Sequence, residues 1–104
     1  MAATLTRDVE EVRRIVLDAL RGQAARVFLF GSYARGEARP TSDIDVAILP
    51  VAPLTRGTLS LLRERLEESS VASEVDLVDL SDADEALRAR VFQEGIEWSA
   101  SGSV

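Results

Sequence analysis

Two aspartates, Asp43 and Asp45, stand two positions apart at the head of the apolar run "SDIDVAILP". If this run is a strand, side chains at i and i+2 point to the same side of the sheet. Twice the rise of a strand then puts the two carboxylates within roughly 7 Å of each other. Such a pair repels unless a cation lies between its members, and Mg²⁺ binds one or two carboxylates together with waters and substrate phosphates. The alternative to a metal site is a strand end exposed to solvent. If the aspartate pair is considered without its surroundings, the exposed strand end is the favoured interpretation.

The turn "GSYARG", residues 31–36, precedes this pair and has the chemistry of an anion site. Gly31 permits a tight reversal and lets another group approach the backbone closely. A short helix beginning near Ser32 would direct free N–H groups outward, an arrangement that binds phosphate. The Ser32 hydroxyl adds a donor, and Arg35 adds a fixed positive charge suited to phosphate oxygens. A Gly-Ser turn after a strand is usually only a turn, but followed by the aspartate pair it indicates a phosphate and metal site.

A third acid, Asp76, lies in the apolar stretch "EVDLVDL" and faces the side opposite to Val75 and Leu77. A carboxylate within such a strand is costly to bury unless it is paired or metal-bound. An exposed sheet face explains Asp76 equally well when the stretch is taken alone. Asp79 has the opposite parity and Glu74 stands at the beginning of the strand, so both are weaker candidates.

The composition excludes several kinds of chemistry. The 104 residues include no cysteine and no histidine, and all 12 basic residues are arginine. Thiol nucleophiles, Ser-His-Asp triads, ordinary zinc sites, P-loop lysines and Schiff bases are therefore excluded. The formal net charge of −6 argues against binding long nucleic acid, which requires a basic surface. It does not argue against a single nucleotide delivered with Mg²⁺.

The elements that must position these residues follow from periodicity and turn signals. We expect a helix over 6–21 with Thr6 as N-cap and Gly22 as its stop, strands at 26–30, 42–50 and 73–80, a helix carrying Leu59, Leu62 and Leu66, and a helix over 81–95 with a Ser81–Asp84 capping box and Gly95 as its end. This order predicts an α/β (α+β) fold, a small mixed sheet packed with helices.

Residues 1–98 are expected to form a single domain, and residues 99–104 a frayed tail. No apolar run is long enough to span a bilayer, and the N-terminus lacks a secretory pattern. The sequence therefore favours a cytoplasmic protein without membrane contacts.

Gly31-Ser32, ten intervening residues and then Asp43-Ile44-Asp45 resemble the signature of the DNA polymerase β-type nucleotidyltransferase superfamily. The fuller "GSYARG…SDIDVAI", with the later "VDLV", resembles its minimal nucleotidyltransferase (MNT) branch. The resemblance implies a polymerase β-like fold, ATP as substrate and two Mg²⁺ ions. It implies catalytic and metal-binding roles for Asp43, Asp45 and Asp76, and contacts to the nucleotide's phosphates from Gly31, Ser32, Arg35 and Ser42.

MNT proteins of this size resemble the antitoxin half of HEPN–MNT toxin–antitoxin pairs, whose toxin is a helical HEPN-type ribonuclease. The resemblance implies transfer of AMP from ATP to a tyrosine of that partner. Two alternatives remain open: a small-molecule hydroxyl acceptor, such as an aminoglycoside, and a non-catalytic antitoxin that acts by binding alone. The sequence does not identify the preferred base or assign a role to Tyr33.

Overall fold

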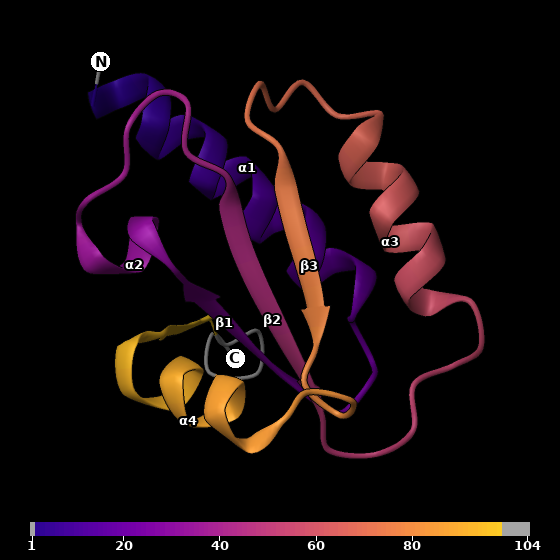
Figure 1. The fold of residues 1–104 in the computed structure, drawn as a ribbon. Helices are drawn as coiled ribbons and strands as arrows, with labels where there is room; N and C mark the ends of the chain where they lie inside the picture. Colours follow the sequence, from indigo (N-terminus) through magenta and orange to yellow (C-terminus); the bar gives the residue numbers. More distant parts are fainter. Residues whose placement is uncertain (1, 99–104) are drawn as a thin grey trace.

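The computed structural model describes residues 2–98 as a four-stranded mixed sheet with helices on both faces (Figure 1). In chain order the elements are α1 (Ala2–Ala19), β1 (Ala25–Phe30), α2 (Ser32–Arg35), β2 (Ile44–Pro50), α3 (Thr58–Glu67), β3 (Val75–Asp79), α4 (Glu85–Glu94) and β4 (Ile96–Trp98). The strand order is β3-β2-β1-β4; β1 is antiparallel to β2 and β4, whereas β2 and β3 are parallel. The predicted fold class is therefore confirmed.

The two faces of the sheet are covered unequally. Helix α1 lies behind the sheet in Figure 1 and α3 stands beside β3, and both contribute to the larger core, in which Ile44, Val46 and Ile48 of β2 are each 0% exposed. Helix α4 covers only one end of the opposite face, over a smaller cluster of Phe28, Phe30, Ala47, Leu80 and Val91. The alternation along β2 thus turns Asp45 and Ala47 toward the less covered face.

The short strand β4 is absent from the elements expected from the sequence. It pairs with β1 through Val27↔Trp98 and Leu29↔Ile96, directly after Gly95 ends α4. Three residues, of which only Trp98 is buried, are too few to give a periodic signal. The structure places Trp98 in the larger core.

Two predicted helix starts are wrong. Helix α1 begins at Ala2 and includes Thr6, because the alanine-rich residues before Thr6 favour helix and contain no breaker. Helix α4 begins at Glu85, and its N-cap is Asp84, whose carboxylate accepts a hydrogen bond of 2.9 Å from the Leu87 N–H. The Ser81–Asp84 capping box is therefore not formed.

Ser81 instead lies in the turn before α4, where its N–H donates to the Asp79 carboxylate at 2.8 Å. The expected frayed tail, residues 99–104, lies outside the described residues. Within residues 2–98, no helix has the length and apolarity needed to cross a bilayer.

Candidate active site

The turn after β1 depends on a glycine at position 31. Gly31 has φ 75° and ψ −153°, a region that is essentially restricted to glycine. A β-carbon at Gly31 would overlap Asp45 Oδ2 and lie 3.1 Å from Asp45 Cγ. The absence of a side chain therefore does two things: it allows this backbone conformation, and it lets the Asp45 carboxylate lie directly against the turn.

The aspartates Asp45 and Asp76 are neighbours in the sheet. They are register partners in the parallel pair β2–β3, and Ala47 and Val78 follow them on the same face. Adjacent strands are about 4.8 Å apart, so the two carboxylates project side by side. Asp43 is exposed and immediately precedes β2, which begins at Ile44 rather than at the expected position 42. The structure thus brings together the two strand acids and places the third at the entrance to β2.

The electrostatics of Asp45 reflect this arrangement. Partial burial raises the pKa of Asp45 above 3.8, and the negative charges of Asp76 and Asp43 raise it further, whereas the charge of Arg35 lowers it. The positive charge of Arg35 therefore offsets only part of the repulsion between Asp45 and the other two aspartates. A cation bound beside Asp45 would favour its ionised form.

The donor set suits a magnesium ion that arrives with other ligands. Among residues 2–98, no three acidic side chains converge closely enough to enclose a metal ion on their own. Mg²⁺ usually takes only one or two protein carboxylates and completes its shell with waters and substrate phosphates. The neighbouring Asp45 and Asp76 carboxylates, whose mutual repulsion Arg35 offsets only in part, fit that requirement.

Arg35, expected to contact phosphate, is held by two carboxylates. Its Nε donates to Glu37 at 3.0 Å and its Nη1 donates to Glu94 of α4 at 3.3 Å. No local pattern marks Glu94 as a site residue, because it lies 59 positions away from Arg35 in the chain. In this structure a triphosphate would have to compete with these carboxylates for the guanidinium group.

Ser32, Ser42 and Tyr33 differ in how they meet the site. Ser32 is partly buried and follows Gly31 directly at the start of α2. The Ser42 hydroxyl accepts a 2.8 Å hydrogen bond from the Arg39 N–H and so closes the loop before Asp43. Tyr33 packs against the larger core, and its buried hydroxyl has no hydrogen-bond partner among the described residues. Its ring therefore supports α2 from the core side.

Comparisons with known proteins agree with this geometry. Residues 18–98 match the family described as "Polymerase beta, Nucleotidyltransferase". A protein adenylyltransferase, MntA, from Shewanella oneidensis is 39% identical over 69 residues, which make up 66% of this chain and 49% of that protein. The chain thus aligns with about half the length of that curated relative.

Two solved structures resemble the fold across most of the chain. A chain in a crystal structure of a toxin–antitoxin with AMP-PNP has a TM-score of 0.67 and 32% identity, with 88% of this chain and 76% of that chain covered. A chain in a complex of tri-AMPylated Shewanella oneidensis HEPN toxin with MNT antitoxin has a TM-score of 0.63 and 27% identity, with 94% and 75% covered.

Proposed function

The chain belongs to the polymerase beta nucleotidyltransferase family, and on that premise we propose that it is a Mg²⁺-dependent protein adenylyltransferase. It transfers AMP from ATP to a tyrosine of a helical HEPN-type toxin and thereby acts as an antitoxin. The observation that carries the proposal is the register that aligns Asp45 with Asp76, together with the close approach of the Asp45 carboxylate to Gly31. Since ATP is the donor, the proposal places the reaction in the cytoplasm, with residues 1–98 as one catalytic domain.

In the proposed reaction the tyrosine oxygen attacks the α-phosphorus of ATP. A phosphorus–oxygen bond to the tyrosine forms, the bond to the β-phosphate breaks, and pyrophosphate leaves. Two Mg²⁺ ions, when bound, supply neutralisation of the charge on the triphosphate. Asp43, Asp45 and Asp76 would hold these ions. Asp76 would also orient the tyrosine hydroxyl and accept its proton.

The remaining site residues bind the donor. The Gly31 and Ser32 N–H groups and the Ser32 hydroxyl donate to the outer phosphates, and the Ser42 hydroxyl adds a donor from the loop before Asp43. Arg35 exchanges its contact with Glu94 for a phosphate oxygen. This exchange costs little, because ion pairs between exposed side chains contribute little to stability.

The proposed partner follows from the relatives. The similar Shewanella oneidensis protein is named a protein adenylyltransferase, and a similar chain is found in a complex with an AMPylated HEPN toxin. A small-molecule acceptor has no comparable support. Inhibition by binding alone requires no grouped carboxylates, whereas this sheet places Asp45 beside Asp76 at an electrostatic cost.

The test is to purify the chain with its HEPN-type partner, add ATP and Mg²⁺, and measure the intact mass of the partner. The proposal expects gains of whole AMP units with the wild type and none with Asp43→Asn. Asp82→Asn makes the same change at an exposed acid outside the site and serves as the matched control. A partner whose mass does not change with the wild-type chain contradicts the proposal.

A further inference from the structure

Within residues 2–98, strand β3 is an edge strand of the sheet and carries one member of the carboxylate cluster, Asp76. Backbone groups along β3 point alternately toward β2 and away from it. The first hydrogen bond between the two strands shows which residues point toward β2: the Ile44 N–H donates to the Glu74 carbonyl at 2.8 Å. Two residues on, Asp76 also directs its backbone groups toward β2, so Val75 and Leu77 direct their N–H and C=O groups outward. The Leu77 carbonyl accepts one long hydrogen bond, of 3.4 Å, from Arg63 Nη2. The outward N–H groups are thus available to pair with a further strand.

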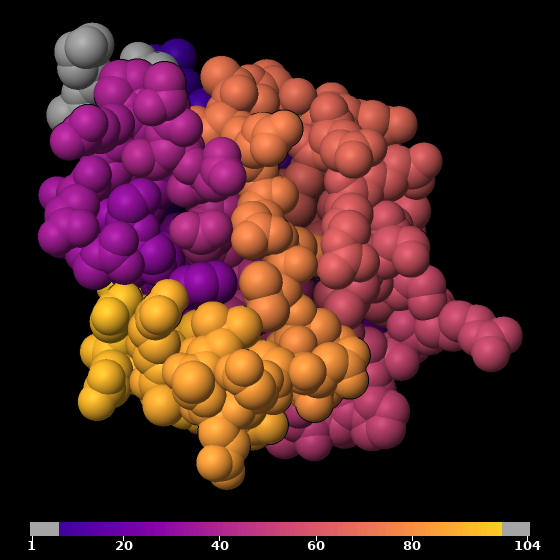
Figure 2. Space-filling model, viewed as in Figure 1, coloured from indigo at the N-terminus to yellow at the C-terminus, as the bar shows by residue number. Residues whose placement is uncertain are grey.

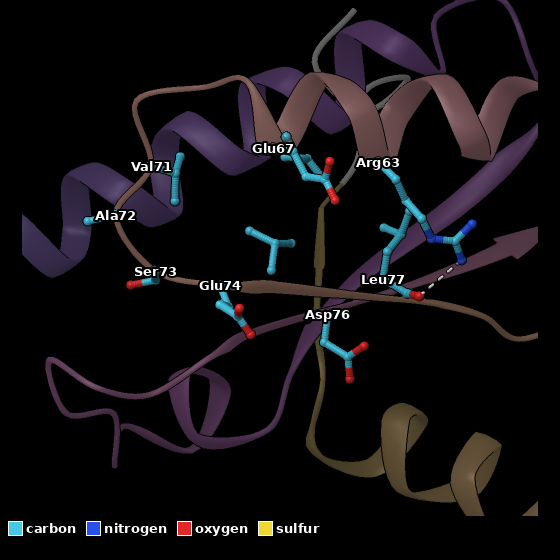
Figure 3. Close-up of a pocket in the computed structure, with 10 residues that line it drawn as sticks. Arg63, Glu67, Val71, Ala72, Ser73, Glu74, Asp76 and Leu77 are labelled. Atoms are coloured by element: carbon cyan, nitrogen blue, oxygen red, sulfur yellow. Dashed lines mark hydrogen bonds between the residues drawn. The ribbon is translucent and has the colours of Figure 1, made fainter.

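A groove of about 480 Å³ runs along this edge. Its apolar lining comes from Leu66, Val71, Val75 and Leu77, and Arg63 and Glu67 of α3 stand above the strand (Figure 3). The Asp76 carboxylate points to the other side of β3, toward the face on which α4 lies (Figure 3). In Figure 2 the orange surface around β3 is uncovered between the purple and magenta atoms of α2 with its following loop and the pink atoms of α3.

A strand added at this edge would continue the sheet about 4.8 Å from β3. Its side chains would alternate between the two faces. Those on the α3 side would contact Leu66 and Val71, and the residue level with Asp76 would project onto the face that carries Asp45. A tyrosine at that position would bring its hydroxyl to the two carboxylates.

The charges around the groove indicate what it binds. Arg63 and Glu67 lie on the α3 side of β3, whereas the Glu74 and Asp76 carboxylates lie on the opposite side (Figure 3). The β3 edge as a whole therefore carries three acids and one cation and is acidic overall. A second copy of this chain is a poor occupant, because pairing two β3 edges would bring Glu74 and Asp76 of both copies together. The complementary partner is an extended segment with a central tyrosine, apolar residues beside it and Lys or Arg further out. Its apolar residues would contact the apolar lining of the groove, and its basic residues would face the acids along the β3 edge.

We propose that the β3 edge binds the acceptor segment of the partner toxin as an added strand, with the acceptor tyrosine level with Asp76. This inference rests on the proposed function and specifies how that site recognises its acceptor. The sheet itself then positions the acceptor hydroxyl beside the two carboxylates.

Charge reversal on the groove wall tests the docking. Glu67→Arg is expected to raise the KM for the partner about tenfold, since a like charge would face the basic segment, while the affinity for Mg²⁺ and AMP-PNP stays unchanged. Glu68→Arg makes the same charge change one residue further along, outside the groove lining, and should match the wild type. Equal KM values for the two variants would overturn the inference.

The rate of amide hydrogen exchange measures whether β3 pairs with an added strand, and this measurement does not require catalysis. In the free chain the Val75 and Leu77 amides should exchange readily, and in the complex with the partner they should become protected at least about tenfold. Continued fast exchange of both amides in the bound complex would rule out strand addition. If AMP transfer failed but this protection appeared, the docking would stand and the proposed activity would fall.

Discussion

Replacing Gly31 with alanine tests how the turn and the carboxylate cluster depend on each other. The φ of 75° and ψ of −153° at this position cost a non-glycine residue on the order of 1–3 kcal/mol. Reduced freedom of the unfolded chain returns about 0.4–1 kcal/mol. The new β-carbon would overlap Asp45 Oδ2, so relief of the clash moves the carboxylate away from the turn. We expect a net loss of about 2 kcal/mol, which lowers the Tm by roughly 8–16 °C in a domain of this size.

The assay is thermal unfolding with and without Mg²⁺ and AMP-PNP, and Gly36→Ala is the control. Gly36 also has a positive φ, 74°, but no atom lies within 4 Å of a β-carbon built there. Its alanine variant should lose on the order of 1 kcal/mol of stability and keep the full ligand-induced rise in Tm. Gly31→Ala should lose that rise as well. If it keeps the rise, or if its Tm falls no further than that of Gly36→Ala, the reasoning is refuted.

Three further predictions concern the charges and the fold. Asp45→Asn should raise the Tm of the metal-free protein at neutral pH. Because the folded-state pKa of Asp45 is raised above 3.8, the wild type should lose stability as pH rises from about that value through the raised pKa, and melting curves across this range should show no such component in the variant. Glu94→Gln should free Arg35 and lower the Kd for Mg²⁺–AMP-PNP by roughly two- to fivefold, the scale of an exposed ion pair; an unchanged or higher Kd by calorimetry would show that Glu94 does not compete with phosphate. Asp84→Ala should cost about 1 kcal/mol of stability in denaturant titration, through loss of the α4 N-cap, with unchanged nucleotide affinity; a change in that affinity would link α4 capping to the site.

Much of the site follows from the sequence because its signals are local. The apolar residues at 44, 46 and 48 fix the core face of β2, so the acid between the first two must lie on the other face. The same parity places Asp76 opposite Val75 and Leu77. The acids become neighbours once the two strands pair in parallel in the register that aligns Asp45 with Asp76, and that register comes from the fold rather than from local signals.

Features that depend on long-range contacts could not be predicted in this way. The Arg35–Glu94 contact forms because the fold brings α4 close to α2. Nothing in the sequence around either residue indicates the other as its partner. Strand β4 forms where Ile96–Trp98 can pair with the edge of β1; Ile and Trp favour strands, but three residues are too few to indicate a strand without that pairing. The choice of Asp84 over Ser81 as N-cap was ambiguous locally, since both residue types are good caps.

The central claim, that Asp43, Asp45 and Asp76 hold divalent ions beneath a triphosphate, is tested most directly by crystallography with Mn²⁺ and AMP-PNP. Anomalous scattering would locate the metal ions independently of the nucleotide. The account predicts anomalous peaks within coordination distance of the Asp45 and Asp76 carboxylates, with the outer phosphates at Gly31 and Ser32. Metal ions bound elsewhere, or an ordered triphosphate away from the turn after β1, would contradict it.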